Sequence, residues 1–138
     1  MTLSSCQVIA HRLAGYNRVV EVGIGTYTDV AVLLTETADV IATDIVDREV
    51  PAGIEFFRDD ITNPTPSIYA GADLLYARNL PPELHRSTYA VACEHDAAFV
   101  FTTLGTDPPA ISDRPEMLPG ETLYWAYRSP NPGRAKSV

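Results

Sequence analysis

Lysine is almost absent from this chain. Its 138 residues include a single lysine, Lys136, beside nine arginines, and 18 acidic side chains give a formal net charge of −8. A surface rich in carboxylates and poor in lysine suits a salt-rich cytosol, where ions screen charge repulsion. The composition therefore predicts a halophilic protein. It does not support a nucleic-acid partner, since binding to phosphate backbones needs clustered lysine and arginine.

Cysteine and long apolar runs are also scarce. Cys6 and Cys93 are the only cysteines, and no Cys/His spacing of a zinc site occurs. Two distant cysteines form no disulfide framework. We therefore expect two reduced thiols, no bound metal and a cytoplasmic location. No stretch approaches the ~18 apolar residues of a membrane span, so no membrane association is expected.

Short apolar runs alternate with helical patterns along the chain. A length near ~140 residues fits one domain. The alternation predicts an α/β fold, Rossmann-like and three-layered, with a doubly wound, mostly parallel sheet of five to six strands. We expect this domain over residues 1–128, followed by a flexible tail at 129–138. The predicted strands cover residues 18–22, 40–44, 54–57, 73–77, 98–102 and 122–127, and the predicted helices cover residues 4–15, 29–36, 66–69 and 81–95.

The segment 104–120 and the strand after it raise a separate question. The segment contains four prolines and exceeds the ~12 to 15 residues usual for a featureless connection. It is therefore predicted to be a lid or a flexible excursion without secondary structure. Tyr124, Trp125 and Tyr127 follow on a strand expected at the sheet edge. That strand could pair with a second copy or a protein partner, or it could simply cover the helices.

A glycine-containing turn follows the first predicted strand. Gly23 and Gly25 allow a tight bend and a close approach to a ligand, and the next helix presents free backbone amides there. A dinucleotide-binding fingerprint would place a third glycine at position 28, which is Thr28. Glu21 precedes the turn and would repel a pyrophosphate, whereas it would suit a cationic amine. These residues disfavour a nicotinamide dinucleotide.

A second carboxylate, Asp44, ends the second predicted strand. At this position in such sheets a carboxylate can accept hydrogen bonds from both hydroxyls of a ribose. Glu21 and Asp44 together describe a ligand that carries a ribose and a positive charge.

The pattern Glu21-Val22-Gly23-Ile24-Gly25, followed by Asp44, resembles the first two motifs of class I S-adenosylmethionine-dependent methyltransferases. The resemblance implies that Glu21 reaches the methionine amino group, that the two glycines lie against the cofactor and that Asp44 holds the ribose. The adenine amine maps to Asp60, with Asp59 as the second choice. Many members carry a third glycine where this chain has Tyr27, which would crowd the cofactor or stack on it. The complete implied cofactor-binding set is Glu21, Gly23, Gly25, Thr26, Tyr27, Asp44, Ile45 and Asp60.

The chain also resembles a small archaeal family of uncharacterised proteins with a methyltransferase-like Rossmann fold. Five sequence segments that match the family in order and spacing support this resemblance over most of the chain. It implies a fold and no established reaction. The segments are residues 20–31, 42–45, 59–61, 76–78 and 81–84.

Arg78 and Asn79 follow the fourth predicted strand, where methyltransferases of this class place groups that orient the substrate. Both are therefore substrate-pocket candidates, and an arginine there could hold an anionic group. The Asn/Asp-Pro-Pro-aromatic signature of amino-group methylation is not present, since Leu80 separates Asn79 from the prolines. His85 on the following helix either lines the cleft or is a solvated surface residue, and we favour the surface.

Two hypotheses about function follow, one for an enzyme and one for a non-catalytic binding protein. The first is an S-adenosylmethionine-binding protein that transfers a methyl group to an unidentified acceptor, with no catalytic side chain identified. The alternative is a non-catalytic Rossmann-like subunit or interaction module, which binds a second copy or a protein partner through its edge strand or acidic surface.

Overall fold

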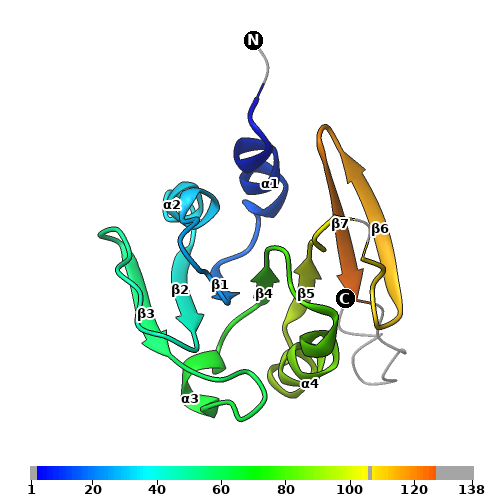
Figure 1. Ribbon diagram of the computed structural model, residues 1–138. Helices are drawn as coiled ribbons and strands as arrows, with labels where there is room; N and C mark the ends of the chain where they lie inside the picture. Colours follow the sequence, from blue (N-terminus) through cyan, green and yellow to red (C-terminus); the bar gives the residue numbers. More distant parts are fainter. Residues whose placement is uncertain (1–2, 106, 127–138) are drawn as a thin grey trace.

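A seven-stranded sheet forms the centre of the molecule. The computed structural model describes residues 3–105 and 107–126, and its sheet has the order β3-β2-β1-β4-β5-β7-β6 (Figure 1). The strands β1 to β5 pair in parallel, whereas β7 is antiparallel to both of its neighbours. The strands are β1 (Arg18–Val22), β2 (Asp39–Asp44), β3 (Ile54–Arg58), β4 (Leu74–Ala77), β5 (Ala98–Phe101), β6 (Asp113–Leu118) and β7 (Glu121–Ala126).

Helices cover both faces of the sheet, so the predicted three-layer α/β architecture is confirmed. The helices α1 and α2 lie on one face, and α3 and α4 lie on the other (Figure 1). Successive residues of β1 alternate between the two apolar cores, because Val19 packs in one core and Val20 in the other. The helices are α1 (Ser5–Leu13), α2 (Asp29–Leu34), α3 (Pro66–Tyr69) and α4 (His85–His95), with a 3-10 turn η1 (Pro82–Leu84) before α4.

The helix α1 begins at a complete capping box. The Ser4 hydroxyl accepts a hydrogen bond from the Gln7 backbone N–H, and the Gln7 side chain accepts one from the Ser4 N–H. This reciprocal cap satisfies two donors that the first turn would otherwise leave free. The helix therefore starts at a defined residue, beside the turn between β6 and β7, where Gly120 lies against Ser5.

The prediction of five to six strands was wrong, because the proline-containing segment 104–120 holds the additional strand β6. Proline is tolerated there because β6 is an edge strand, where one backbone N–H need not pair. Turning at Gly120, with φ of 76°, the chain returns as β7.

The position predicted for the last strand was also wrong. β7 is an internal strand, since it pairs with β5 on one side and β6 on the other. β6 is therefore the outer strand that could pair with another chain, and Pro115 interrupts its row of donors. Tyr127 and the tail at 129–138 lie outside the described residues.

In the part of the chain that the structure describes, no helix has both the length and the apolar character needed to cross a bilayer.

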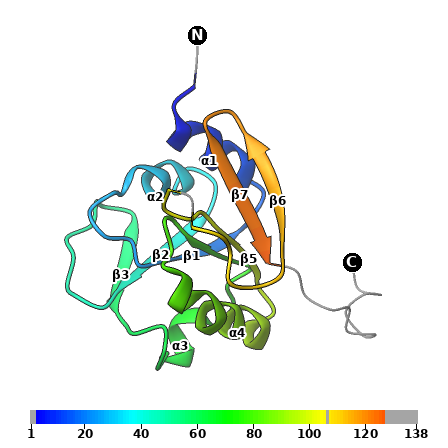
Figure 2. The ribbon, with the colours of Figure 1, turned by 45° about the vertical axis from the view of Figure 1, so that its right-hand side comes forward.

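The β6–β7 hairpin is attached to α1 by a polar and aromatic contact. The Arg12 Nε lies 2.8 Å from both Glu116 carboxylate oxygens, and its guanidinium lies 4.7 Å from the centre of the Trp125 ring. The Trp125 Nε1 donates to Glu116 at 2.9 Å, and its ring stacks on Tyr16. Figure 2 shows the hairpin beside α1. Trp125 therefore joins the last two strands to the first helix.

We expect Trp125→Ala to destabilise the protein by about 2 kcal/mol, because it removes a large half-buried ring together with its hydrogen bond and cation contact. Urea unfolding at constant high salt measures the change. Met117→Ala in the same hairpin is the control: Met117 is 84% exposed, so the expected change is within about 0.5 kcal/mol. Equal losses in the two variants would contradict the proposed attachment.

Candidate functional site

A cavity of about 290 Å³ opens at the carboxyl edge of the parallel strands. It lies where the strand order reverses, since β1 has β2 on one side and β4 on the other. Ligands of open α/β sheets bind at this kind of switch point. The lining residues come from the ends of four strands and the loops after them: Val22, Gly23, Gly25, Thr43, Asp44, Ile45, Arg48, Asp59, Ile61, Arg78, Asn79, Leu80, Pro81 and Leu84.

The glycine turn after β1 leaves open space beside the cavity. Gly23 and Gly25 have φ of 68° and 60°, a region that residues with a side chain rarely adopt. A Cβ added to either residue would meet no atom within 4 Å. The Ile24 N–H donates to the Thr43 carbonyl at 3.0 Å, which holds the turn against β2. Glycine is therefore required by the backbone conformation, and the space above it is free for a ligand.

Asp44 lies at the edge of the cavity, where β2 ends. Its Oδ2 accepts a hydrogen bond from the Gly25 N–H at 2.8 Å, which fixes the carboxylate against the turn. Arg48 contacts the same oxygen at 3.3 Å, and the Val46 N–H lies 3.3 Å from Oδ1. The Arg48 contact is long, so a diol could replace it and donate to this carboxylate.

Glu21 is buried without a complete set of partners. It is 2% exposed, and its Oε1 has no hydrogen-bond partner in the part of the chain that the structure describes. Burial raises the pKa of Glu21 to about 8, and the positive charge of Arg78 opposes that rise. A buried polar atom without a partner is rare in folded proteins and requires an explanation. A cation brought beside Glu21 would supply the donor and favour the ionised carboxylate.

Tyr76 lies next to Glu21 across the sheet. The two residues are paired in the register of β1 and β4, and the Tyr76 hydroxyl also has no partner among the described residues. Burial raises the pKa of Tyr76, and the nearby Glu21 carboxylate raises it further. Sequence reasoning missed Tyr76. Its pairing with Glu21 depends on the register of β1 and β4, which a local sequence pattern does not give.

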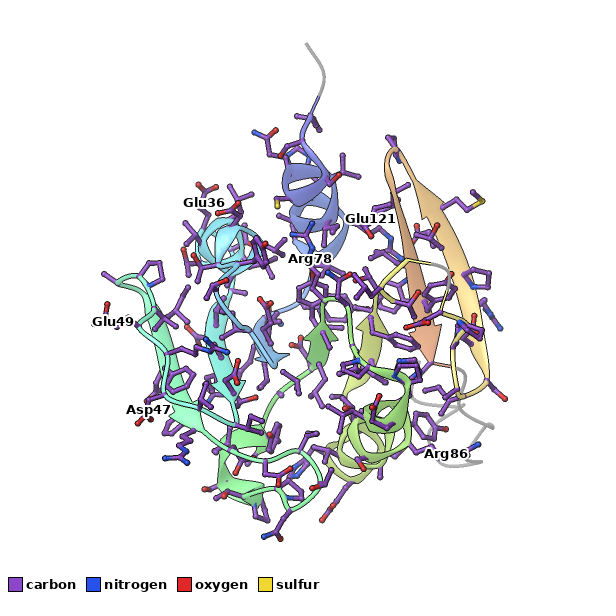
Figure 3. All side chains as sticks on the ribbon, viewed as in Figure 1. Glu36, Asp47, Glu49, Arg78, Arg86 and Glu121 are labelled. Carbon is purple, nitrogen blue, oxygen red and sulfur yellow. The ribbon has the colours of Figure 1, made fainter. Side chains whose placement is uncertain are left out.

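Arg78 and Asn79, the predicted substrate-pocket candidates, both line the cavity. The Arg78 Nη1 lies 3.2 Å from the Cys6 sulfur at the start of α1, and Figure 3 shows Arg78 below that helix. Asn79 has φ of 52°, and its N–H donates to the Thr102 hydroxyl at 2.7 Å. The loop after β4 is therefore tied to α1 on one side and to β5 on the other.

The two acidic residues after β3 have different surroundings. Asp59 lines the cavity, and both of its carboxylate oxygens are engaged, by the Tyr69 hydroxyl at 2.8 Å and the Thr65 N–H at 3.2 and 3.3 Å. Asp60 is exposed and does not line the cavity. Its Oδ1 accepts from the Thr62 hydroxyl and N–H, which lowers the pKa of Asp60. The structure thus places the second choice, Asp59, inside the cavity and Asp60 outside it.

The other predicted cofactor contacts lie partly inside the cavity and partly outside it. Ile45 lines the cavity and is 65% exposed, so its apolar surface is accessible from the cavity. Thr26 and Tyr27 are exposed and do not line the cavity. Tyr27 therefore does not crowd the space above the glycine turn.

The prediction that His85 is a solvated surface residue was wrong. His85 is fully buried, its Nε2 lies 2.9 Å from the Leu80 carbonyl, and its Nδ1 accepts from the Ala110 N–H at 2.9 Å. Its ring packs against Phe101. A helical position alone could not reveal this burial, because the loop that contributes Ala110 follows much later in the chain.

The sequence model described as "Uncharacterised protein family (UPF0146)" matches residues 3–128. A UPF0146 protein of Halobacterium salinarum is 46% identical over 104 residues, which cover 75% of this chain and 81% of the relative. A UPF0146 protein of Methanothermobacter thermautotrophicus is 34% identical over 114 residues, covering 80% of this chain and 82% of the relative. The predicted resemblance to a small archaeal family is confirmed.

Solved structures share the fold at low identity. An RNA methyltransferase from Salinibacter ruber in complex with S-adenosyl-L-homocysteine superposes with a TM-score of 0.60 at 16% identity, over 91% of this chain and 92% of that one. The glycopeptide N-methyltransferase MtfA complexed with S-adenosyl-L-methionine gives a TM-score of 0.56 at 15% identity, over 89% of this chain and 66% of that one. These similarities confirm the methyltransferase-like Rossmann fold.

The buried Glu21 carboxyl predicts a pH dependence of stability. Its pKa is about 8 in the folded chain and near 4.5 in an unfolded one, so the folded state binds more protons between these values. The stability that the protonated Glu21 carboxyl contributes is fully present below pH 4.5 and is lost as pH rises through about 8. The free energy of unfolding should therefore fall across this window, at most by about 1.4 kcal/mol per pH unit.

Glu21→Gln should remove this part of the decline, as measured by urea unfolding at several pH values in constant salt. Glu36→Gln, which removes an exposed carboxylate outside the site, should leave it unchanged. A decline of the same size in Glu21→Gln and the wild type would assign the titration to another group.

Proposed function

The chain belongs to the UPF0146 family. We propose that it binds S-adenosylmethionine in the cavity at the carboxyl edge and catalyses transfer of the cofactor's methyl group to an acceptor. The observation that carries the proposal is the cavity itself, which joins the open glycine turn to the Asp44 carboxylate at the switch point between β1 and β4. Proteins of the same fold hold S-adenosylmethionine or S-adenosyl-L-homocysteine in their solved structures.

Gly23, Gly25, Asp44 and Ile45 line the cavity and fit this cofactor, whereas the buried Glu21 does not itself line it. The unpartnered Glu21 Oε1 would accept a hydrogen bond from the cofactor's ammonium group. The space above Gly23 and Gly25 would hold the part of the cofactor that lies against the backbone of the turn. Asp44 would accept the ribose hydroxyls after Arg48 moves away. The roles of Glu21 and the two glycines follow from an unfilled acceptor and an unfilled space, and the role of Asp44 follows from its long contact with Arg48.

The adenine end of the cofactor would lie beside Ile45. For the adenine amine we propose Asp60, because in the described part of the chain only one of its oxygens accepts hydrogen bonds, whereas both oxygens of Asp59 do. Asp60 would have to turn toward the cavity to make this contact. Thr26 and Tyr27 would contact the cofactor only after a similar movement of the turn.

The bound cofactor supplies a methyl group activated by its sulfonium. The chain's own contribution is alignment, since holding the reactants in position lowers the barrier without an obligatory side-chain participant. The backbone of the turn and Asp44 would fix the cofactor. Arg78 and Asn79, which line the same cavity, would orient the acceptor beside it.

We expect Asp44→Asn to weaken binding of S-adenosylmethionine and S-adenosylhomocysteine by about tenfold or more, because a hydrogen bond to a charged group is lost. Isothermal titration calorimetry in molar salt measures the change. Asp47→Asn is the matched control, because Asp47 is an exposed carboxylate three residues later (Figure 3). Its affinity should equal that of the wild type.

Absence of binding of both ligands to the wild type at millimolar concentration would overturn the proposal. Preferential binding of NAD would replace it with a dinucleotide site. Tight cofactor binding without methyl transfer to any acceptor would favour the non-catalytic subunit.

Gly23→Ala should abolish or strongly weaken cofactor binding, because the added methyl group fills the space that the cofactor would use. The positive φ also makes this substitution destabilising, by about 1 kcal/mol. Gly71→Ala is the control for that strain: its φ is 81°, and the residue lies before β4, at the opposite edge of the sheet. It should lose comparable stability and keep the wild-type affinity, and equal affinities in both variants would contradict the role of Gly23.

A further inference from the structure

The carboxylate of Asp44 is already largely occupied by donors of its own chain. A carboxylate offers about four hydrogen-bonding positions, shared equally between its oxygens. At Oδ2 the Gly25 N–H lies at 2.8 Å and the Arg48 Nε–H at 3.3 Å, and at Oδ1 the Val46 N–H lies at 3.3 Å. Among the described residues, no other donor reaches this carboxylate. Oδ2 is therefore filled, whereas Oδ1 has one open position.

The three donors differ in how firmly they are held. Gly25 and Val46 donate from the backbone, so they can leave only if the turn or the loop after β2 moves. Arg48 donates from a flexible side chain that is 33% exposed, and its contact is long. A partly exposed ion pair of this kind is weak. Of the three donors, Arg48 is therefore the one that a ligand can displace at low cost.

Asp44 does not depend on Arg48 for its position. Its backbone carbonyl accepts from the Asp59 N–H at 2.9 Å, and the two backbone donors hold the carboxylate. A second arginine, Arg58, is paired with Asp44 in the register of β2 and β3, but its Nε donates to the Ile45 carbonyl at 3.1 Å. Displacement of Arg48 would therefore open a position on Oδ2 and leave the carboxylate in place.

A vicinal diol needs a position on each oxygen of Asp44. Its two hydroxyl groups donate one hydrogen bond to each, as when a strand-end carboxylate holds a ribose. With Arg48 in place, Oδ2 cannot accept the second bond. A ligand with a single hydroxyl needs only the open position on Oδ1, so it can bind beside Arg48. Both residues line the same cavity, so the arginine and the ligand would compete within it.

We infer that Arg48 is an internal competitor of the cofactor's ribose and thereby sets the affinity of the site for a vicinal diol, a conclusion that rests on the proposed function. The guanidinium occupies Asp44 in the empty chain, leaves it when both ribose hydroxyls bind, and returns when the product departs. Weaker product binding favours release, a step that limits the rate of many enzymes.

Three ligands of equal charge test this competition. They are S-adenosylhomocysteine and its 2′-deoxy and 3′-deoxy forms, each of which lacks one ribose hydroxyl. Isothermal titration calorimetry in constant molar salt measures their affinities for the wild type and for Arg48→Met, which removes the guanidinium and keeps an unbranched side chain. We expect S-adenosylhomocysteine to bind about threefold more tightly to Arg48→Met, because the ion pair no longer competes. The affinities of both deoxy forms should stay unchanged.

Arg86→Met is the matched control. Arg86 is exposed on α4 and lies outside the cavity (Figure 3), and its substitution removes the same charge. All three affinities should equal those of the wild type. The same gain in Arg86→Met would assign the effect to net charge and would overturn the inference.

A second measurement uses the wild-type chain alone, so it provides the test if Arg48→Met does not fold. The Arg48 Nε–H gives its own NMR signal. On binding of S-adenosylhomocysteine this signal should move toward the position of the exposed Arg86 signal. With either deoxy form it should keep the position of an Nε–H bonded to a carboxylate. An equal movement with all three ligands would overturn the inference.

The calorimetric outcomes separate the two proposals. If S-adenosylhomocysteine binds the wild type and Arg48→Met leaves its affinity unchanged or lowers it, this inference is overturned and the cofactor proposal stands. An equal gain for the deoxy forms would also overturn it, because the effect would not depend on the second hydroxyl. If S-adenosylhomocysteine does not bind, the cofactor proposal fails, and the inference fails with it.

Discussion

The parallel pairing of β1 with both β2 and β4 is the constraint on which the rest of the structure depends. Parallel strands end at the same edge, so the loops after β1, β2, β3 and β4 all meet around one cavity. The same pairing removes Glu21 from water, because neighbouring strands flank it and the helices of its face cover it. The raised pKa of its carboxyl and the unfilled acceptor at Oε1 both follow from that burial. A buried carboxylate with one unfilled oxygen at the end of the central strand is therefore a consequence of the sheet order.

The carboxylates of the chain fall into two groups with different surroundings. Glu36, Asp47 and Glu49 project from the outside of the molecule (Figure 3), where water and salt solvate them. Glu21 and Asp44 are buried at the end of their strands and have defined geometries. Asp44 is held by the turn that it faces, whereas Glu21 lacks a partner for one oxygen among the described residues. The proposed cofactor site uses both of these buried carboxylates.

Much of the fold could be predicted because the strands β1 to β5 are short apolar runs separated by helices or glycine turns. Local patterns were sufficient for these elements, since burial on both faces leaves few polar residues in a parallel strand. The strand β6 could not be predicted in this way. It is exposed on one side and contains Pro115, so its sequence is typical of a loop. The internal position of β7 followed only from its pairing with β6, and the burial of His85 only from the loop that reaches it.

The sequence by itself determined the glycine turn, the two strand-end carboxylates and the order of the helices and of β1 to β5, because each depends on residues close together in the chain. The tertiary structure decided which of these groups share a cavity. It placed Asp59 inside and Asp60 outside, and it aligned Tyr76 with Glu21. These relations depend on strand register and on burial, which arise from contacts between residues far apart in sequence. A local pattern carries no information about the dielectric environment that such contacts create.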